Sequence, residues 1–208
     1  MQVHHIGPFH EDPNFKVTPP PREEVTPEIY AFIGRCVPIV CTDLVFIDDE
    51  RRFVLAYRRN ACARGWWWKG GSRKAGMTRE ASLAALMQRE IGFMPDGVHH
   101  FAHFDHFWSE RGEIPHEVGR HDIIDLHIVR VNEATIAKIK LDPKEYDAER
   151  GFMRYNGTQE VRPVVKAAYE TYLNMPRPPA PNPWNSWEEM EKDDQVLRAQ
   201  EAARGGKV

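Results

Sequence analysis

The stretch RGWWWKGGSRKAGMTREASLAALMQREIGF, residues 64–93, decides the fold. It runs from a tryptophan triplet through a glycine pair into a segment with apolar residues at helical spacing. Thr78 is a favoured N-cap residue for that segment, and Gly92 is a favoured C-terminal stop. The pattern therefore predicts a loop over residues 66–71 that leads into an amphipathic helix over residues 79–91.

One face of this predicted helix is apolar except for a single carboxylate. Leu83, Leu86, Met87 and Glu90 share the face at helical spacing. Burying a carboxylate without a partner is unfavourable, so Glu90 lies at the edge of the face or meets a cation. The glycine pair before the helix lets backbone carbonyls approach a ligand or a metal closely.

Composition narrows the class of protein. The chain has 208 residues, 41% of them hydrophobic, which suits one domain with a real core. Its net charge of -3 gives no sign of the excess positive charge that is typical of nucleic-acid-binding proteins. We expect no signal peptide, and the sequence has no apolar run near the roughly 20 residues that a membrane span needs. The three cysteines form no CxxC pair, which indicates reduced thiols in a cytoplasmic protein.

Strands mixed with helices predict an α/β or α+β layer fold. Residues 1–26 are expected to be an extension, residues 27–174 the folded domain, and residues 175–208 a Pro-rich and charged tail with one surface helix over 187–203. Within the domain, the patterns predict helices and strands at the following places: helices over 27–34, 132–140 and 160–172, a hairpin over 37–47 and 52–57, and strands over 98–108 and 123–131.

The opening stretch resembles the Nudix box, in which a glycine, a fixed spacing and four glutamates precede a final Gly–apolar pair. In the frame that runs from residue 71 to residue 93, five positions match: Gly71, Met87, Glu90, Gly92 and Phe93. Four positions depart from the pattern, where Met77, Ala85, Leu86 and Arg89 stand. Glutamates at helix positions i, i+3 and i+4 would hold several Mg²⁺ ions. Only Glu90 remains of those three, so a cluster of several ions is not expected.

The depleted box is similar to that of the GDP-mannose mannosyl hydrolases, a branch that holds one Mg²⁺. Four flanking stretches extend this resemblance, namely residues 37–43, 53–60, 65–71 and 147–155. The resemblance implies a Nudix-type α/β/α sandwich with a mixed β-sheet. It further implies Mg²⁺-dependent hydrolysis of a nucleoside-diphosphate-linked substrate, with a nucleotide sugar such as GDP-mannose favoured, and a homodimer.

Residues can be assigned to this chemistry one by one. The resemblance places the metal ligands at the Gly70 carbonyl, Glu90 and Glu149. It places substrate-orienting residues at Asp43 and Arg58, with Arg59 or Arg64 as alternatives. The branch also has an arginine directly after the glycine pair, where this chain has Ser72 followed by Arg73. An aromatic side chain of the triplet, Trp67, is expected to stack on the substrate, while one or two of the three tryptophans lie in the core.

The general base is the main gap in this assignment. The branch uses a histidine where this chain has Arg150, and arginine stays protonated and cannot serve as a base. The candidates are therefore His103, His106 and His121, with Glu113 and Glu117 in a predicted loop.

Three alternative hypotheses remain open from the sequence. In the first, Glu90 only neutralises Arg89 or Arg79, and the chain is a catalytically silent Nudix-fold module that binds a nucleotide or a partner. In the second, the histidine-rich strand binds zinc through His103 and Asp105. In the third, the scaffold performs a non-hydrolytic acid–base step. Convergence of Glu90, Glu149 and the Gly70 carbonyl would favour the metal-dependent hydrolase over the binding module.

Overall fold

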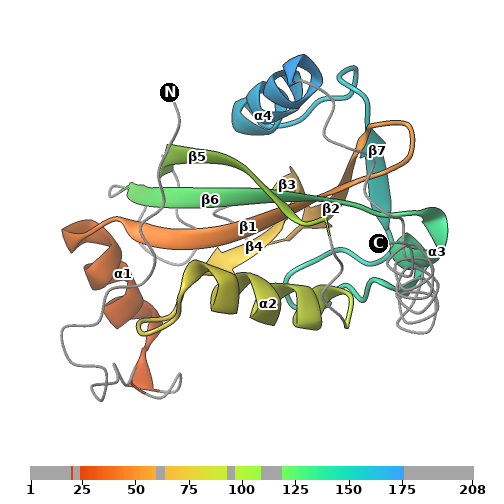
Figure 1. Cartoon of the computed structure of the whole chain (residues 1–208). Helices are drawn as coiled ribbons and strands as arrows, with labels where there is room; N and C mark the ends of the chain where they lie inside the picture. Colours follow the sequence, from red (N-terminus) through yellow and green to blue (C-terminus); the bar gives the residue numbers. More distant parts are fainter. Residues whose placement is uncertain (1–19, 21–23, 60–63, 93–96, 109–118, 176–208) are drawn as a thin grey trace, which may run out of the picture.

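The computed structural model describes residue 20 and residues 24–59, 64–92, 97–108 and 119–175 (Figure 1). Its helices are α1 (Pro27–Cys36), α2 (Arg79–Glu90), α3 (Glu133–Lys138) and α4 (Pro163–Asn174). Its strands are β1 (Ile39–Ile47), β2 (Phe53–Arg58), β3 (Gly65–Trp67), β4 (Lys69–Ser72), β5 (His99–Trp108), β6 (Arg120–Arg130) and β7 (Phe152–Tyr155). No helix in these ranges combines the length and the apolar character that crossing a bilayer requires.

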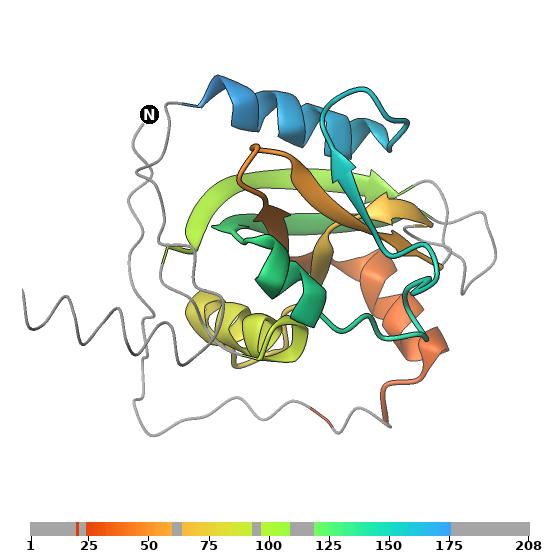
Figure 2. The same cartoon turned by 90° about the vertical axis from the view of Figure 1, so that its right-hand side faces the viewer.

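The strands form one mixed sheet of seven strands. Its main path runs β3-β2-β1-β6-β5, with β4 paired to β1 and β7 paired to β2. The β1–β6 pair is parallel, and the other pairs are antiparallel. Helix α4 covers one face of the sheet, and α2 and α3 lie against the other (Figures 1 and 2). The predicted α/β/α sandwich with a mixed sheet is therefore confirmed.

Alternation along β1 divides the core into two layers. Leu44 and Phe46 pack with apolar residues of α2 and α3. Cys41 and Val45 pack with the aromatic cluster under α4. Because neighbouring residues of a strand point to opposite faces, Asp43 shares the face of Cys41 and Val45. This division decides which of the predicted site residues can meet.

The helix that the opening stretch predicts is present, and its ends have the expected chemistry. The Thr78 hydroxyl accepts a hydrogen bond from the Ala81 amide at 3.1 Å. Gly92, at φ 86°, ends the helix in the left-handed conformation that glycine adopts without strain. The Thr26 hydroxyl likewise accepts from the Ile29 amide at the start of α1. These signals are local, which explains why the sequence reveals them.

Several details differ from the sequence-based prediction. Residues 66–71 do not form a loop, because most of them lie in β3 and β4. Strand β6 starts earlier than expected, at Arg120, and β7 has no counterpart in the prediction. The helix predicted over residues 187–203 lies outside the described residues, as do most of the two terminal extensions.

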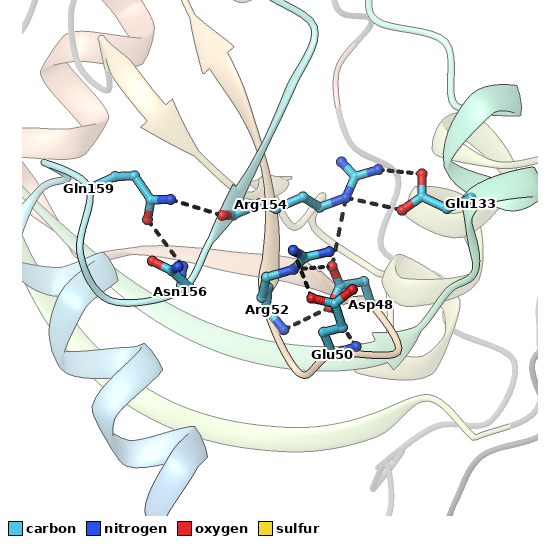
Figure 3. Close-up of polar contacts among 7 residues, drawn as sticks. All are labelled: Asp48, Glu50, Arg52, Glu133, Arg154, Asn156 and Gln159. Carbon is cyan, nitrogen blue, oxygen red and sulfur yellow. Dashed lines mark hydrogen bonds and ion pairs between the residues drawn. The ribbon is translucent and has the colours of Figure 1, made fainter.

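The predicted hairpin between β1 and β2 is present, and a buried carboxylate holds its turn (Figure 3). Asp48 accepts hydrogen bonds from the backbone amides of Glu50 and Arg52 at 3.0 and 2.8 Å. It also accepts from the Arg52 guanidinium at 2.7 Å. Arg154 of β7 approaches the same carboxylate at 3.7 Å and pairs with Glu133 of α3 at 2.7 Å. The network ties the turn to β7 and to α3.

Candidate functional site

A cavity of about 180 Å³ lies where β1 and β6 begin and β5 ends, next to α1. Four charged side chains line it: Asp43, Arg58, Arg120 and Asp122. Three aromatic side chains complete the wall: Tyr30, Trp67 and Trp108. The cavity thus combines two carboxylates, two guanidinium groups and aromatic surface.

Asp43 is the most unusual group in the cavity. Its side chain is almost wholly buried, and one of its oxygens accepts a hydrogen bond from the Trp68 indole at 2.7 Å. Burial raises the pKa of Asp43 to about 7, although the Trp68 hydrogen bond and the charge of Arg58 act in the opposite direction. A carboxyl group with this pKa can exchange a proton near neutral pH, as a general base must.

Gly70 makes room for this carboxylate. Asp43 and Gly70 lie opposite each other in the β1–β4 ladder. A Cβ atom at residue 70 would overlap the Asp43 carboxylate, whereas a Cβ atom at Gly71 would meet nothing within 4 Å. Residue 70 must therefore be glycine, because the Asp43 carboxylate lies against it, whereas residue 71 has room for a side chain.

The second carboxylate of the cavity is held in a similar way. Asp122 accepts a hydrogen bond from the Trp108 indole at 2.8 Å and a second one from Arg120. Arg120 also lies over the Tyr30 ring, 5.1 Å from its centre. The Tyr30 hydroxyl contacts the Ser72 hydroxyl at 2.5 Å, which joins α1 to β4. Arg120 is thus largely engaged by the protein itself.

Arg58 has more free hydrogen-bonding capacity than Arg120. Its Nε atom is buried and has no hydrogen-bond partner among the described residues. Its nearest carboxylate oxygen belongs to Glu145 at 3.8 Å, and the Tyr146 ring centre lies at 5.9 Å. A guanidinium group with unused donors at a cavity wall suits a phosphate group, which accepts several hydrogen bonds at once.

The structure brings some of the predicted substrate-binding residues together and separates others. Asp43, Arg58 and Trp67 all line the cavity. Arg73 does not, because its guanidinium donates to Asp125. Asp125 lies three residues from Asp122 on β6 and therefore points to the opposite face of the sheet.

The predicted catalytic histidines have three different surroundings. The His103 ring lies 2.8 Å from the Asp125 carboxylate, away from the cavity. Burial would raise the pKa of Asp125, but hydrogen bonds from His103 and Arg73 outweigh it and lower that pKa. His121 contacts Asp105 at 2.7 Å on the surface. Glu113 and Glu117 lie outside the described residues.

His106 is the predicted histidine closest to the cavity. Its ring packs on two aromatic residues of the cavity wall, with centres 5.8 Å from Trp67 and 4.1 Å from Trp108. It lies opposite Asp122 in the β5–β6 ladder. Burial lowers the pKa of His106, so its neutral form is favoured. It stands behind the aromatic wall and does not line the cavity.

The residues predicted to hold magnesium do not fit a divalent ion as they are arranged. Glu90 is buried, and the Lys69 ammonium group lies 3.1 Å from one of its oxygens. Arg89 contacts the other oxygen at 3.0 Å and also donates to the Gly70 carbonyl at 3.4 Å. Glu149 is exposed in the turn before β7. Two of the three predicted ligands therefore face cations that belong to the chain.

The zinc alternative also finds no ligand set in the described part of the chain. There, no group of three or more His, Cys, Asp or Glu side chains gathers in a way that could hold a metal ion. His103 uses its ring nitrogen on Asp125, and Asp105 pairs with His121. Both residues of the predicted pair are engaged with other side chains.

Sequence reasoning missed half of the cavity. Tyr30, Trp108, Arg120 and Asp122 come from α1, β5 and β6, and no local motif joins them to β1. It also missed Lys69 as a partner of Glu90. A signal for that pair was present, because lysine stands where the resembling family usually has proline, directly before the glycine pair.

Comparisons with known proteins give the following. No protein-family model and no curated protein matches the chain. Among solved structures, it is similar to a MutT Nudix hydrolase from Burkholderia pseudomallei, with 17% identity and a TM-score of 0.49, over 65% of this chain and 98% of that one. It is also similar to a MutT protein from Methanosarcina mazei Go1, with 16% identity and a TM-score of 0.47, over 65% and 93% of the two chains.

A third similar structure is a binary complex of the Ap4A hydrolase of C. elegans. The identity is 11% and the TM-score 0.47, over 65% of this chain and 95% of that one. At these identities the likeness concerns the fold.

Proposed function

We propose that the chain is a Nudix-type hydrolase that cleaves a nucleoside-diphosphate derivative in the cavity described above, with Asp43 as general base. A nucleotide sugar such as GDP-mannose is the favoured substrate. The observation that carries the proposal is the buried Asp43 carboxyl, whose pKa of about 7 comes with a place on a cavity wall beside Arg58. A carboxyl group in this state is typical of acid–base catalysis at neutral pH.

The lining of the cavity supports the substrate class. Arg58 has a buried Nε atom without a partner in the described residues, which suits a phosphate oxygen. The aromatic surface of Trp67 and Trp108 suits a sugar or a base. A volume of about 180 Å³ is below the roughly 300–1,000 Å³ of a pocket for a whole drug-sized ligand. The cavity therefore takes the reacting part of the substrate and leaves the rest outside.

The proposed reaction is attack by water on the sugar carbon or on a phosphorus atom. Asp43 accepts a proton from the water as the new bond to oxygen forms. The C–O or P–O bond to the leaving group then breaks, and the leaving phosphate oxygen takes the electron pair. Arg58 balances the negative charge that develops there. Asp122, fixed by Trp108 and Arg120, keeps the opposite wall in place.

The test is turnover of a panel of nucleotide sugars and nucleoside diphosphates, followed by phosphorus NMR in ¹⁸O-labelled water. We expect Asp43→Asn to lower kcat by about 10²–10⁴-fold, the usual contribution of a general base. Asp49→Asn is the matched control, because Asp49 lies in the same hairpin but is exposed and pairs with Arg130 at 3.0 Å. Equal turnover by wild type and Asp43→Asn would contradict the role of Asp43.

A binding module without turnover is the second candidate. The observation in its favour is that Glu90 and the Gly70 carbonyl are already paired with Lys69 and Arg89. Calorimetry separates the two candidates when it is run with the same panel of nucleotides. Tight binding without any product in the wild type would favour the module.

The homodimer implied by the resemblance stays a prediction. Sedimentation velocity of the full chain measures it directly. A species of twice the 24.1 kDa chain mass is the expected result.

A further inference from the structure

The Lys69 side chain lies in the core, where a lysine is rarely found. It is 3% exposed, and its partner Glu90 is 6% exposed. Lysine sits opposite Leu44 in the β1–β4 ladder, on the face that packs against α2. Because lysine is almost never fully buried unless it is paired, the ammonium group needs a partner at this position.

Two groups surround the ammonium group and define its position. One Glu90 oxygen lies 3.1 Å from the ammonium nitrogen and forms an ion pair with it. The Tyr146 ring lies below it, with its centre 3.5 Å from the nitrogen, which is a close cation–π contact. Tyr146 is itself 2% exposed. The ammonium group is therefore enclosed between a carboxylate and an aromatic face.

Arg89 completes the arrangement from the outside. Its guanidinium contacts the second Glu90 oxygen at 3.0 Å and the Gly70 carbonyl at 3.4 Å. The carboxylate and the carbonyl are the two hard oxygen donors of this corner, and magnesium requires such donors. Both already face a positive charge of the chain. The sum of one carboxylate and two cations is positive, which repels a further cation.

We infer that Lys69 is a built-in cation that takes the place of a divalent metal ion between Glu90 and β4, with Arg89 as its outer companion. The corner is a cation site that the chain fills from within. Metal binding at Glu90 is therefore excluded in the folded protein, and any chemistry in the neighbouring cavity runs without a divalent ion at this position. The occupancy of this corner of the fold does not depend on turnover.

Titration of the full chain with Mn²⁺, read by electron paramagnetic resonance of the free ion, tests the inference. We expect Glu90→Gln to leave the number of Mn²⁺ ions bound by the otherwise unchanged chain the same as in the wild type. We expect one additional Mn²⁺ site in the double variant Lys69→Ala/Arg89→Glu, which replaces both cations, and its loss when Glu90→Gln is added. A wild-type site that Glu90→Gln abolishes would overturn the inference. A folded double variant that binds no Mn²⁺ would also overturn it.

Thermal unfolding of the wild type keeps the test valid if the double variant does not fold. We expect MgCl₂ to leave the Tm of the wild type unchanged, because a ligand raises the Tm only if it binds the folded state. Glu90→Gln should lower the Tm strongly, since it leaves Lys69 buried without its anion. A metal ligand would behave in the opposite way, with a Tm that rises on adding MgCl₂ and a rise that Glu90→Gln removes.

The matched control is an exposed pair of the same chemistry. Lys166 and Glu170 lie 3.9 Å apart on α4, with side chains 63% and 61% exposed. Glu170→Gln should leave the Tm within about 1 °C of the wild-type value, because exposed pairs contribute little to stability. A fall in Tm as large as that of Glu90→Gln would show that the effect comes from net charge and not from the buried pair.

Discussion

Asp43 and Asp48 lie close together in the sequence, one on β1 and one in the turn that follows it. The hydrogen-bond donors around their carboxylates nevertheless differ. Both side chains are almost fully buried, at 5% and 3% exposure. Asp48 accepts two backbone amides and one guanidinium, and Arg154 stands nearby (Figure 3). Asp43 has the Trp68 indole as its side-chain donor and faces a cavity.

The difference shows that the donors around a buried carboxylate decide what it can do. Several donors and cations hold the Asp48 carboxylate in place, so it works as a structural tie. Asp43 has fewer donors, and burial then raises its pKa toward neutrality. The Lys69–Glu90 pair is a third case, in which an ammonium group and not a set of amides meets the carboxylate. The following predictions test this contrast.

The largest effect on stability is expected from Asp48→Ala. This change leaves two turn amides without their acceptor and removes the carboxylate to which Arg52 donates and which lies 3.7 Å from Arg154. The expected loss is about 3 kcal/mol in the free energy of unfolding, measured by urea denaturation. The activity of the molecules that remain folded should be unchanged.

Asp43→Asn is the counterpart of this variant. An amide oxygen can still accept from Trp68, and the cost of burying a charge disappears, so Asp43→Asn should be at least as stable as the wild type at pH 7. The contrast between the two positions would be broken if Asp43→Asn proved as destabilising as Asp48→Ala.

The next effect concerns the glycine pair. In Gly70→Ala the new methyl group overlaps the Asp43 carboxylate and must displace it. We expect a loss of about 1–3 kcal/mol in stability, as for other overpacked sites, together with a large fall in kcat. Gly71→Ala is the matched control, since its Cβ atom meets nothing within 4 Å. Similar behaviour of the two variants would show that the Asp43 position is not tied to Gly70.

The pH dependence of kcat/KM follows from the raised pKa of Asp43. As a base it must be ionised, so kcat/KM should rise about tenfold per pH unit below pH 7 and level off above it. Asp43→Asn should remove this rise.

The free energy of unfolding should also depend on the ionisation of Asp43, but it should fall as the pH rises, whereas kcat/KM rises. The folded pKa of about 7 lies above the ordinary value of 3.8, so the folded state binds more protons between these pH values. The contribution of Asp43 to stability is therefore full below about pH 4 and is lost as the pH rises through 7. Urea midpoints of wild type and Asp43→Asn across this range measure it. A difference between them that does not change with pH would contradict the shifted pKa.

The smallest effect is expected at His121. Its contact with Asp105 lies on the surface, with side chains 31% and 60% exposed. His121→Ala should change stability by less than about 0.5 kcal/mol and leave turnover as it is. A loss of activity in this variant would move the search for the base away from the cavity and toward the surface of β5 and β6.

Much of the fold could be predicted from the sequence because its signals are local. Thr78 and Gly92 mark the ends of α2, and apolar, β-branched runs on either side of a polar turn reveal β1 and β2. Strands β3, β4 and β7 have three or four residues each, too few to show a period, and two of them are rich in glycine or tryptophan. They exist because neighbouring strands pair with them, which no local pattern expresses.

The site was only partly predictable for the same reason. Asp43, Arg58 and Trp67 could be named because they follow motifs on β1 to β3. Asp122 and Arg120 reach the cavity only through the pairing of β1 with β6. The contact of Lys69 with Glu90 depends on the register of β4 against β1 and on the position of α2, which the sequence does not state.

The parallel pairing of β1 with β6 also has a consequence for how the protein folds. It joins distant parts of the chain, as the contact between His127 and the Asp43 carbonyl shows, which are 84 positions apart in the sequence. Closing such a long segment carries a large entropic barrier, so this step belongs late in folding. The two carboxylates of the cavity therefore meet only when most of the sheet is complete. A nascent or damaged chain that lacks this pairing has Asp43 but no cavity, and catalytic competence itself becomes a measure of the last folding event.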